Sequence, residues 1–230
     1  MQKHGFTIGV NWYRVHTLDI EKKEDGTFKQ NDGKHLIKNE LRECDPSLAD
    51  TLTEIATSKN RSVAAIQKAD LIPNAVYYDE YLTVEGRREW HQKAMKKFEN
   101  VELVFMDPDN GLLANYLFEK KRDARSIKYA FFEEVKDYIE SEKSVLVYNH
   151  RGRVREKKFI EDKNDKLHEI VRVNKEEIKV IAFPKGTVRY YFAIPACHEH
   201  YKMFHEAFAD MTDMMNSKWG KLGVCRFSPE

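Results

Sequence analysis

This 230-residue sequence is poor in cysteine and has no long apolar run, and each absence excludes a class of protein. Its three cysteines, Cys44, Cys197 and Cys225, form no Cys-x-x-Cys pair, so no disulfide framework is expected. No apolar run approaches the roughly 18 residues of a membrane span, and a strand is predicted too soon after Met1 to leave room for a signal peptide. We therefore expect a cytoplasmic protein that has no membrane partner.

The common cofactor and catalytic motifs are also missing. No G-x-G-x-x-G follows the first predicted strand and no G-x-x-x-x-G-K-[ST] is present, which argues against a dinucleotide or P-loop site. Neither G-x-S-x-G nor H-E-x-x-H occurs. The one cluster of potential metal ligands, Cys197, His198, His200 and His205, has spacings that place helical side chains on different faces. The sequence thus predicts no bound cofactor and no metal.

Charge is almost balanced, with 39 basic and 38 acidic side chains and a net charge of +1. A surface that binds nucleic acid would therefore have to be local. Two basic runs offer one: Lys120, Lys121, Arg122 and Arg125, and then Arg151, Arg153, Arg155, Lys157 and Lys158. Such runs are usually solvated helix faces, but both of these follow predicted strands and would lie near one edge of a sheet.

Short apolar runs that end in turn residues predict buried strands at 6–10, 75–78, 103–106 and 144–148. Helical spacing is present at 46–58, 62–70, 84–98, 126–141, 154–171 and 198–215, and the segments 178–183 and 188–194 flank a turn. These patterns predict one α/β domain over residues 1–230, with a polar loop or small insertion at 14–45. The expected architecture is a doubly wound, mostly parallel sheet of four βα units with a C-terminal antiparallel hairpin. Oligomeric state is left open.

Polar residues follow all four of these predicted strands. In open α/β sheets, ligands bind at the edge where the parallel strands end, here called the carboxyl edge. The alternative is that such residues only cap the helices that follow. We predict Asn11, Asp107 and Asp109 as catalytic residues. The predicted substrate-binding residues are Trp12, Tyr13, Asn110, Tyr148, Asn149, His150, Arg151 and Arg153.

Two short motifs resemble known families. Gly9-Val10-Asn11 resembles the G-x-N motif of the mismatch-specific branch of the uracil-DNA glycosylase superfamily. That resemblance implies a four-stranded parallel sheet, a water-positioning role for Asn11, and a second motif at Asn149-His150-Arg151. Trp12-Tyr13 stands where the family has Pro-Gly, and no His-Pro-Ser is present.

Asp107-Pro108-Asp109-Asn110 resembles the D-P-P-[YF] motif of class I amino-methyltransferases. The predicted helix, strand, helix and hairpin after it are similar to the second half of that fold. The resemblance implies S-adenosylmethionine as the cofactor, with Asp79-Glu80 at its ribose. An asparagine replaces the aromatic fourth residue, and the glycine-rich loop expected after the first strand is missing.

We predict an N-glycosidase that flips a base, modified or unmodified, into an acidic pocket and excises it from single- or double-stranded DNA. Asp107 would stabilise the oxocarbenium charge or act as the base, and Asn11 would hold the attacking water or the flipped base. One alternative is a nucleic-acid methyltransferase, and another is a nucleotide- or DNA-binding module without chemistry. A magnesium-dependent nuclease that uses Asp79, Asp107 and Asp109 is a fourth hypothesis.

Overall fold

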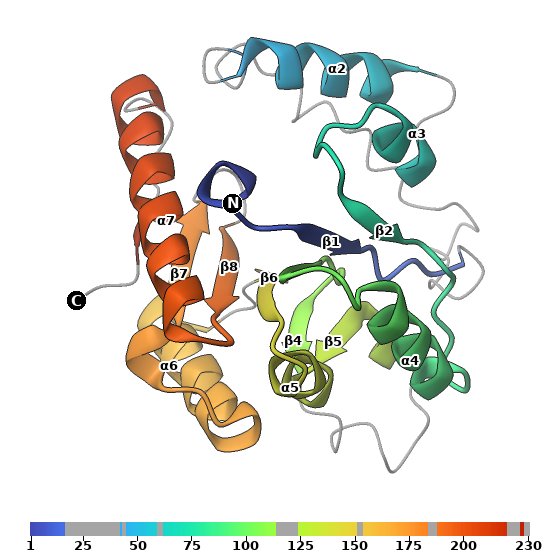
Figure 1. Cartoon of the computed structure of the whole chain (residues 1–230), viewed down its shortest axis with the longest axis vertical. Coiled ribbons are helices and arrows are strands. Elements are labelled where there is room, and N and C mark those ends of the chain that lie inside the picture. The colour runs from blue at the N-terminus through green and yellow to red at the C-terminus, as the bar shows by residue number, and fades with distance from the viewer. Residues whose placement is uncertain are drawn as a thin grey trace.

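A computed structural model describes residues 1–16, 42, 45–58, 62–113, 124–150, 154–183, 188–219 and 226–227 (Figure 1). Most of the predicted insertion at 14–45 and the turn of the predicted hairpin lie outside these residues. The described residues form a seven-stranded sheet in the order β2-β1-β3-β6-β8-β7-β9.

The four predicted parallel strands occupy one half of this sheet. They are β1 (Ile8–Asn11), β2 (Val76–Tyr78), β3 (Leu103–Met106) and β6 (Ser144–His150), and neighbouring strands among them run parallel. The predicted hairpin forms the other half, since β8 (Arg189–Ile194) lies antiparallel between β6 and β7 (Lys179–Phe183). The short β9 (Arg226–Phe227) extends β7. The predicted α/β class, mostly parallel with a C-terminal antiparallel pair, is confirmed.

Most helices lie where the sequence predicted them. They are α2 (Pro46–Thr57), α3 (Val63–Lys68), α4 (Arg87–Lys97), α6 (Glu156–Lys166) and α7 (His198–Trp219). Asp45 caps α2 as its position suggests, because its side chain accepts a hydrogen bond of 2.9 Å from the backbone N–H of Leu48. A π-helical turn, η6 (Leu167–Val171), follows α6, and short 3-10 turns occur at η1 (Gln2–His4) and η7 (Lys175–Glu177).

The helix predicted over 126–141 is different. Its first part forms a 3-10 turn, η5 (Ala124–Lys128), and a strand, β5 (Tyr129–Phe131), and only α5 (Phe132–Glu140) is an α-helix. β5 pairs in parallel with β4 (Gly111–Leu113), which the sequence did not indicate. The backbone N–H of Phe131 donates to the Glu134 carboxylate at 2.9 Å, so α5 begins only after this strand. Tertiary pairing has overridden the local helical pattern.

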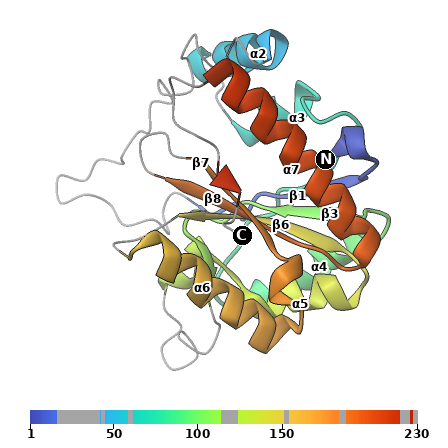
Figure 2. The same cartoon turned by 90° about the vertical axis from the view of Figure 1, so that its left-hand side faces the viewer.

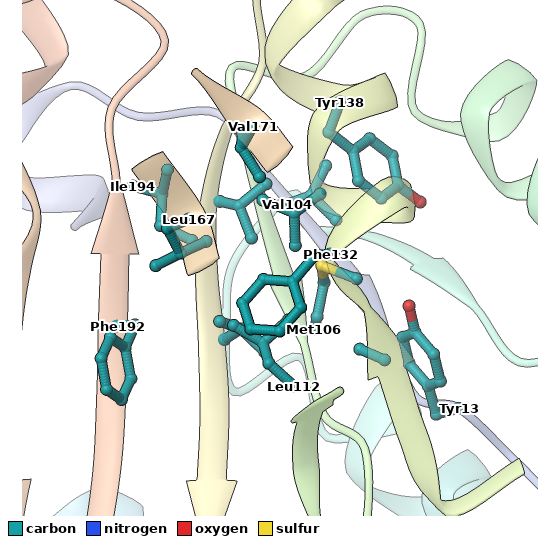
Figure 3. Packing of buried hydrophobic residues seen from close by; sticks show 14 of the residues in the cluster. Tyr13, Val104, Met106, Leu112, Phe132, Tyr138, Leu167, Val171, Phe192 and Ile194 are labelled. Atoms are coloured by element: carbon teal, nitrogen blue, oxygen red, sulfur yellow. The ribbon is translucent and has the colours of Figure 1, made fainter. Parts of the chain in front are cut away.

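Helices cover the two faces of the sheet unequally (Figure 2). α4, α5 and α6 lie on one face, here called the helix-covered face, and α7 lies on the other together with α2 and α3 (Figure 2). The core of the helix-covered face includes Val104, Met106, Phe132, Tyr138 and Phe192, all at most 2% exposed (Figure 3). On the opposite face, α7 buries a smaller cluster through Phe204 and Phe208. No residue of α2 is buried, so its attachment to the sheet is slight.

Candidate functional site

Asp107 lies at the carboxyl edge, directly after β3, as predicted. Its backbone N–H donates to the carbonyl of Asn11 at 3.0 Å, which continues the β1–β3 pairing by one residue. Side chains alternate along a strand, so Asp107 lies on the face opposite to Met106. Because Met106 belongs to the helix-covered core, the carboxylate of Asp107 is directed to the face that carries α7.

The pKa of Asp107 is unusual for a carboxylic acid. Partial burial raises it from its usual value near 3.8 to about 6, and the nearby carboxylate of Asp109 contributes to the shift. Among the described residues, no group makes a hydrogen bond or ion pair to the Asp107 side chain. Asp107 is therefore positioned to exchange a proton near neutral pH.

Partly exposed rings lie on the same face of the sheet as Asp107. We call this group the aromatic face, and it consists of Trp12, Tyr77, Phe105, Tyr148 and Tyr191. Trp12 stacks on Tyr77 with ring centroids 6.3 Å apart and planes 7° from parallel. Tyr191 contacts both Phe105, at 6.4 Å, and Tyr148, at 5.7 Å. Rings that lie partly exposed beside a carboxylate are a suitable surface for stacking a planar ligand.

Charged groups at the margin of the aromatic face are held by their neighbours. Burial raises the pKa of the Tyr148 hydroxyl, and the charges of Asp107 and Asp109 raise it further. The guanidinium of Arg189 hydrogen-bonds this hydroxyl and acts in the opposite direction, lowering its pKa. Asp109 is exposed and lies 3.7 Å from the ammonium of Lys128. Two carboxylates thus lie near the rings, and one of them already has a partner.

Asn11, which we predicted to hold a water beside Asp107, lies on the other face. It is paired in register with Met106, is fully buried, and donates from Nδ2 to the hydroxyl of Tyr138 at 3.4 Å. Its Oδ1 is 3.5 Å from the backbone N of Tyr13. The structure therefore does not bring Asn11 and Asp107 into one site, and the geometry gives no support to a water-positioning role.

Tyr13, predicted to bind substrate, is also part of the core. Its hydroxyl donates to Glu134 at 2.9 Å, and Glu134 forms a bidentate ion pair with Arg87 at 2.7 and 2.8 Å. Burial and the negative charge of Glu134 raise the pKa of Tyr13 well above its usual value. The residue adopts a positive φ of 47°, which turns the chain under α5 after β1. Its position is that of a structural residue.

Asn149 is a second predicted binding residue with a structural position. It is 1% exposed, and its Oδ1 accepts a hydrogen bond of 2.9 Å from the backbone N–H of Leu112. Gly111 lies against this side chain with a φ of +107°, and an added Cβ would lie 2.4 Å from that oxygen. Asn149 and Gly111 together hold β4 next to β6, which fixes the chain just after Asp107.

The remaining predicted residues are divided. Tyr148 and Trp12 belong to the aromatic face. His150 and Asn110 are partly exposed at the carboxyl edge, where the backbone N–H of His150 donates to the Asn110 carbonyl at 3.2 Å. Arg151 and Arg153 lie outside the described residues. On α6, Lys157 and Lys158 are exposed and pair with acids one turn along at 3.8 and 2.9 Å, as on an ordinary solvated helix face.

The nuclease hypothesis needs three carboxylates around one metal ion. Asp79 instead lies beside Arg14, at 4.0 Å from its guanidinium. Within the described part of the chain, no three His, Cys, Asp or Glu residues group closely enough to hold a metal. The geometry therefore gives this hypothesis no support.

Sequence reasoning missed Phe105 and Tyr191, which complete the aromatic face. Phe105 lies two residues before Asp107, and Tyr191 lies between two buried residues of its strand. Side chains two residues apart on a strand share a face, so this spacing could have placed Phe105 beside Asp107. The spacing identifies a site residue only once the face that Asp107 occupies is known.

Comparison with protein-family models finds no match, and comparison with curated protein sequences finds none either. Within the described residues, no helix has the length and apolar character needed to cross a membrane. The geometry around Asp107 is therefore the main indication of function.

Proposed function

We propose that this protein hydrolyses the N-glycosidic bond of a nucleobase in DNA, with the base stacked on the aromatic face. The observation that carries the proposal is Asp107, a partly buried carboxylate without a partner among the described residues, whose pKa is raised to about 6. Cleavage of this bond develops positive charge on the sugar, which a carboxylate stabilises, and the same group can take a proton from water. Neither task requires a cofactor.

Asp107 performs both of these tasks, and Asn11, which lies in the core, has no part in them. Trp12, Phe105 and Tyr148 bind the base by stacking, which favours a base extruded from its strand. Asp109, exposed and paired with Lys128, contributes negative charge at the margin of the site.

The test is base release from DNA that contains a panel of modified and unmodified bases, measured as strand breaks after alkali. Asp107→Asn should lower the rate by about 10²–10⁴-fold, the usual contribution of a catalytic acid or base. The matched control is Asp162→Asn, which makes the same chemical change on the exposed side of α6 and should leave the rate unchanged.

Because the ionised carboxylate is the active form, the rate of base release should rise through about pH 6 and then level off. Intact strands across the whole panel would contradict the proposal.

Methyl transfer is the second candidate, and the fold favours it. The hairpin strand β8 inserted between β6 and β7, with Asp107 at the end of β3, resembles the second half of the class I methyltransferase fold. The residues after β1 do not fit the cofactor, however. Trp12 and Arg14 pair with β2 and the chain after it. The N–H of Trp12 donates to the carbonyl of Tyr78 at 3.2 Å, and the N–H of Leu82 donates to the carbonyl of Arg14 at 2.7 Å. Tyr13 fills the space under this turn, being 4% exposed.

Calorimetry with S-adenosylmethionine separates the two candidates. We expect no binding at millimolar concentration, because the turn at Tyr13 is closed by protein groups. Binding with micromolar affinity would favour the methyltransferase instead.

A further inference from the structure

The charge around Asp107 differs from that expected of a site for a neutral base. The aromatic face offers ring surfaces, the indole N–H of Trp12 and tyrosine hydroxyls, which could meet a neutral base as well as a charged one. Its margin adds the two carboxylates Asp107 and Asp109, whereas the nearby cations are engaged. Arg189 hydrogen-bonds Tyr148, and Lys128 is 3.7 Å from Asp109. The Asp107 carboxylate thus remains without a cationic partner among the described residues.

Rings and a free carboxylate together favour a cation. The face of an aromatic ring attracts positive charge within about 6 Å of its centroid, most strongly for tryptophan. Trp12 and Phe105 lie on the same side of the sheet as Asp107, and Tyr148 joins them through its ring contact with Tyr191. Near such rings the ionised form of an unpaired carboxyl group is unfavourable, and a cation beside it would stabilise that form. The geometry points to a ligand that is both planar and positively charged.

We infer that the substrate is a cationic nucleobase, such as a purine alkylated on a ring nitrogen, rather than a neutral base. This inference rests on the proposed glycosidase function and names its substrate class. The positive ring would lie on the aromatic face, with the carboxylate of Asp107 beside it.

The chemistry of the reaction agrees with this substrate. When the bond between C1′ and the base nitrogen breaks, its electron pair goes to the base, which neutralises the positive charge. Water adds to C1′ and its proton passes to the Asp107 carboxylate, so the products are a neutral base, an abasic sugar and a protonated carboxyl group. The leaving base needs no proton from an acid, and Asn11, which lies in the core, is not required.

Binding can be tested without catalysis. The probes are 1-methyladenosine, which is cationic at neutral pH, and adenosine, each titrated against the intrinsic tryptophan fluorescence of the full chain. At pH 7.5 we expect 1-methyladenosine to bind at least about tenfold more tightly, as a desolvated cation–aromatic contact and a carboxylate would provide. Asp107→Asn should remove most of this preference, and Asp162→Asn should retain it.

The preference should also depend on pH. It should increase between about pH 5 and 7 as Asp107 ionises, because the pKa of this group is near 6. The other titratable and charged groups at this site are Asp109 on the same loop, Tyr148 and His150 on β6, Arg189 on β8 and Lys128 before β5. His150→Gln removes the imidazole from this set and serves as a second variant, in which the pH dependence should stay in place.

Base release completes the test, with DNA treated with dimethyl sulfate compared with DNA containing uracil. Preferential binding and release of methylated bases would support both proposals. A binding preference for 1-methyladenosine without any base release would support the cationic ligand and overturn the glycosidase. Release of neutral uracil with equal binding of the two nucleosides would overturn the cationic substrate and keep the glycosidase. Equal binding with no release would overturn both.

Discussion

The two faces of the sheet use similar residues for different purposes. On the helix-covered face, polar side chains such as Asn11, Glu134 and Asn149 are buried and have partners within the protein. On the opposite face, Asp107 lies among partly exposed rings and has no partner in the described part of the chain. Buried polar groups that are satisfied specify the fold, whereas an unsatisfied one at a sheet edge indicates a ligand site.

This difference separates residues that are adjacent in the sequence. Met106 and Asp107 are neighbours, yet one is fully buried under α5 and the other faces the aromatic residues. Trp12 and Tyr13 are divided in the same way. Mutations on the two faces should therefore have opposite profiles, with loss of stability on one and loss of activity on the other.

The largest expected effect is on the helix-covered face. Glu134→Gln removes one partner of the buried ion pair with Arg87 and should lower the free energy of unfolding by about 3–5 kcal/mol. Urea denaturation measures the change. Glu140→Gln on the same helix alters an exposed pair with Lys136 at 3.5 Å and should cost less than about 0.5 kcal/mol. Equal losses in the free energy of unfolding for the two variants would show that the buried ion pair contributes no more to stability than the exposed one.

Asp107→Asn should raise the free energy of unfolding, whereas Glu134→Gln lowers it. The carboxyl group ionises near pH 4 in the unfolded chain but at about pH 6 in the folded protein, so the native state loses stability as the pH rises through this interval. The amide does not ionise, and the variant should be more stable than the natural protein by up to about 3 kcal/mol at pH 8. This gain should disappear below about pH 4, as urea denaturation at several pH values would reveal. A variant that is less stable at pH 8 would indicate that Asp107 has a structural role.

Asn11→Ala tests whether Asn11 stabilises the core of the helix-covered face or acts in catalysis. Loss of the hydrogen bond to Tyr138 should lower the free energy of unfolding by about 1–2 kcal/mol. Base release per folded molecule should remain unchanged, as measured well below the melting temperature. If activity falls by orders of magnitude while stability is retained, Asn11 acts in catalysis after all.

The smallest effect is expected under α7. The hydroxyl of Ser144 accepts a hydrogen bond of 2.9 Å from the N–H of Ala196 and lies 2.8 Å from Nδ1 of His200. Ser144→Ala should therefore cost about 1 kcal/mol, because only part of this network is buried. Thermal unfolding gives the change, and activity should not respond. A strong loss of activity would mean that the position of α7 controls the aromatic face.

Much of the fold followed from local patterns. The four parallel strands and the hairpin were predictable because buried apolar runs ended in turn residues. β4 and β5 were not, because Gly111–Leu113 and Tyr129–Phe131 become strands only by pairing with each other. The resemblance of Gly9-Val10-Asn11 to a glycosylase motif implied a catalytic asparagine, and only the register with Met106 shows that this side chain is in the core.

The sequence alone determined that Asp107 would lie at the carboxyl edge of a central strand, because Pro108 and Gly111 end an apolar run there. Tertiary structure decided which polar residues share a site with it. A strand presents alternate side chains to opposite faces, so a shift of one residue in register moves every side chain from core to surface. Register depends on pairing between distant segments. For this reason the composition of the site around Asp107 could not be obtained from the order of residues along the chain.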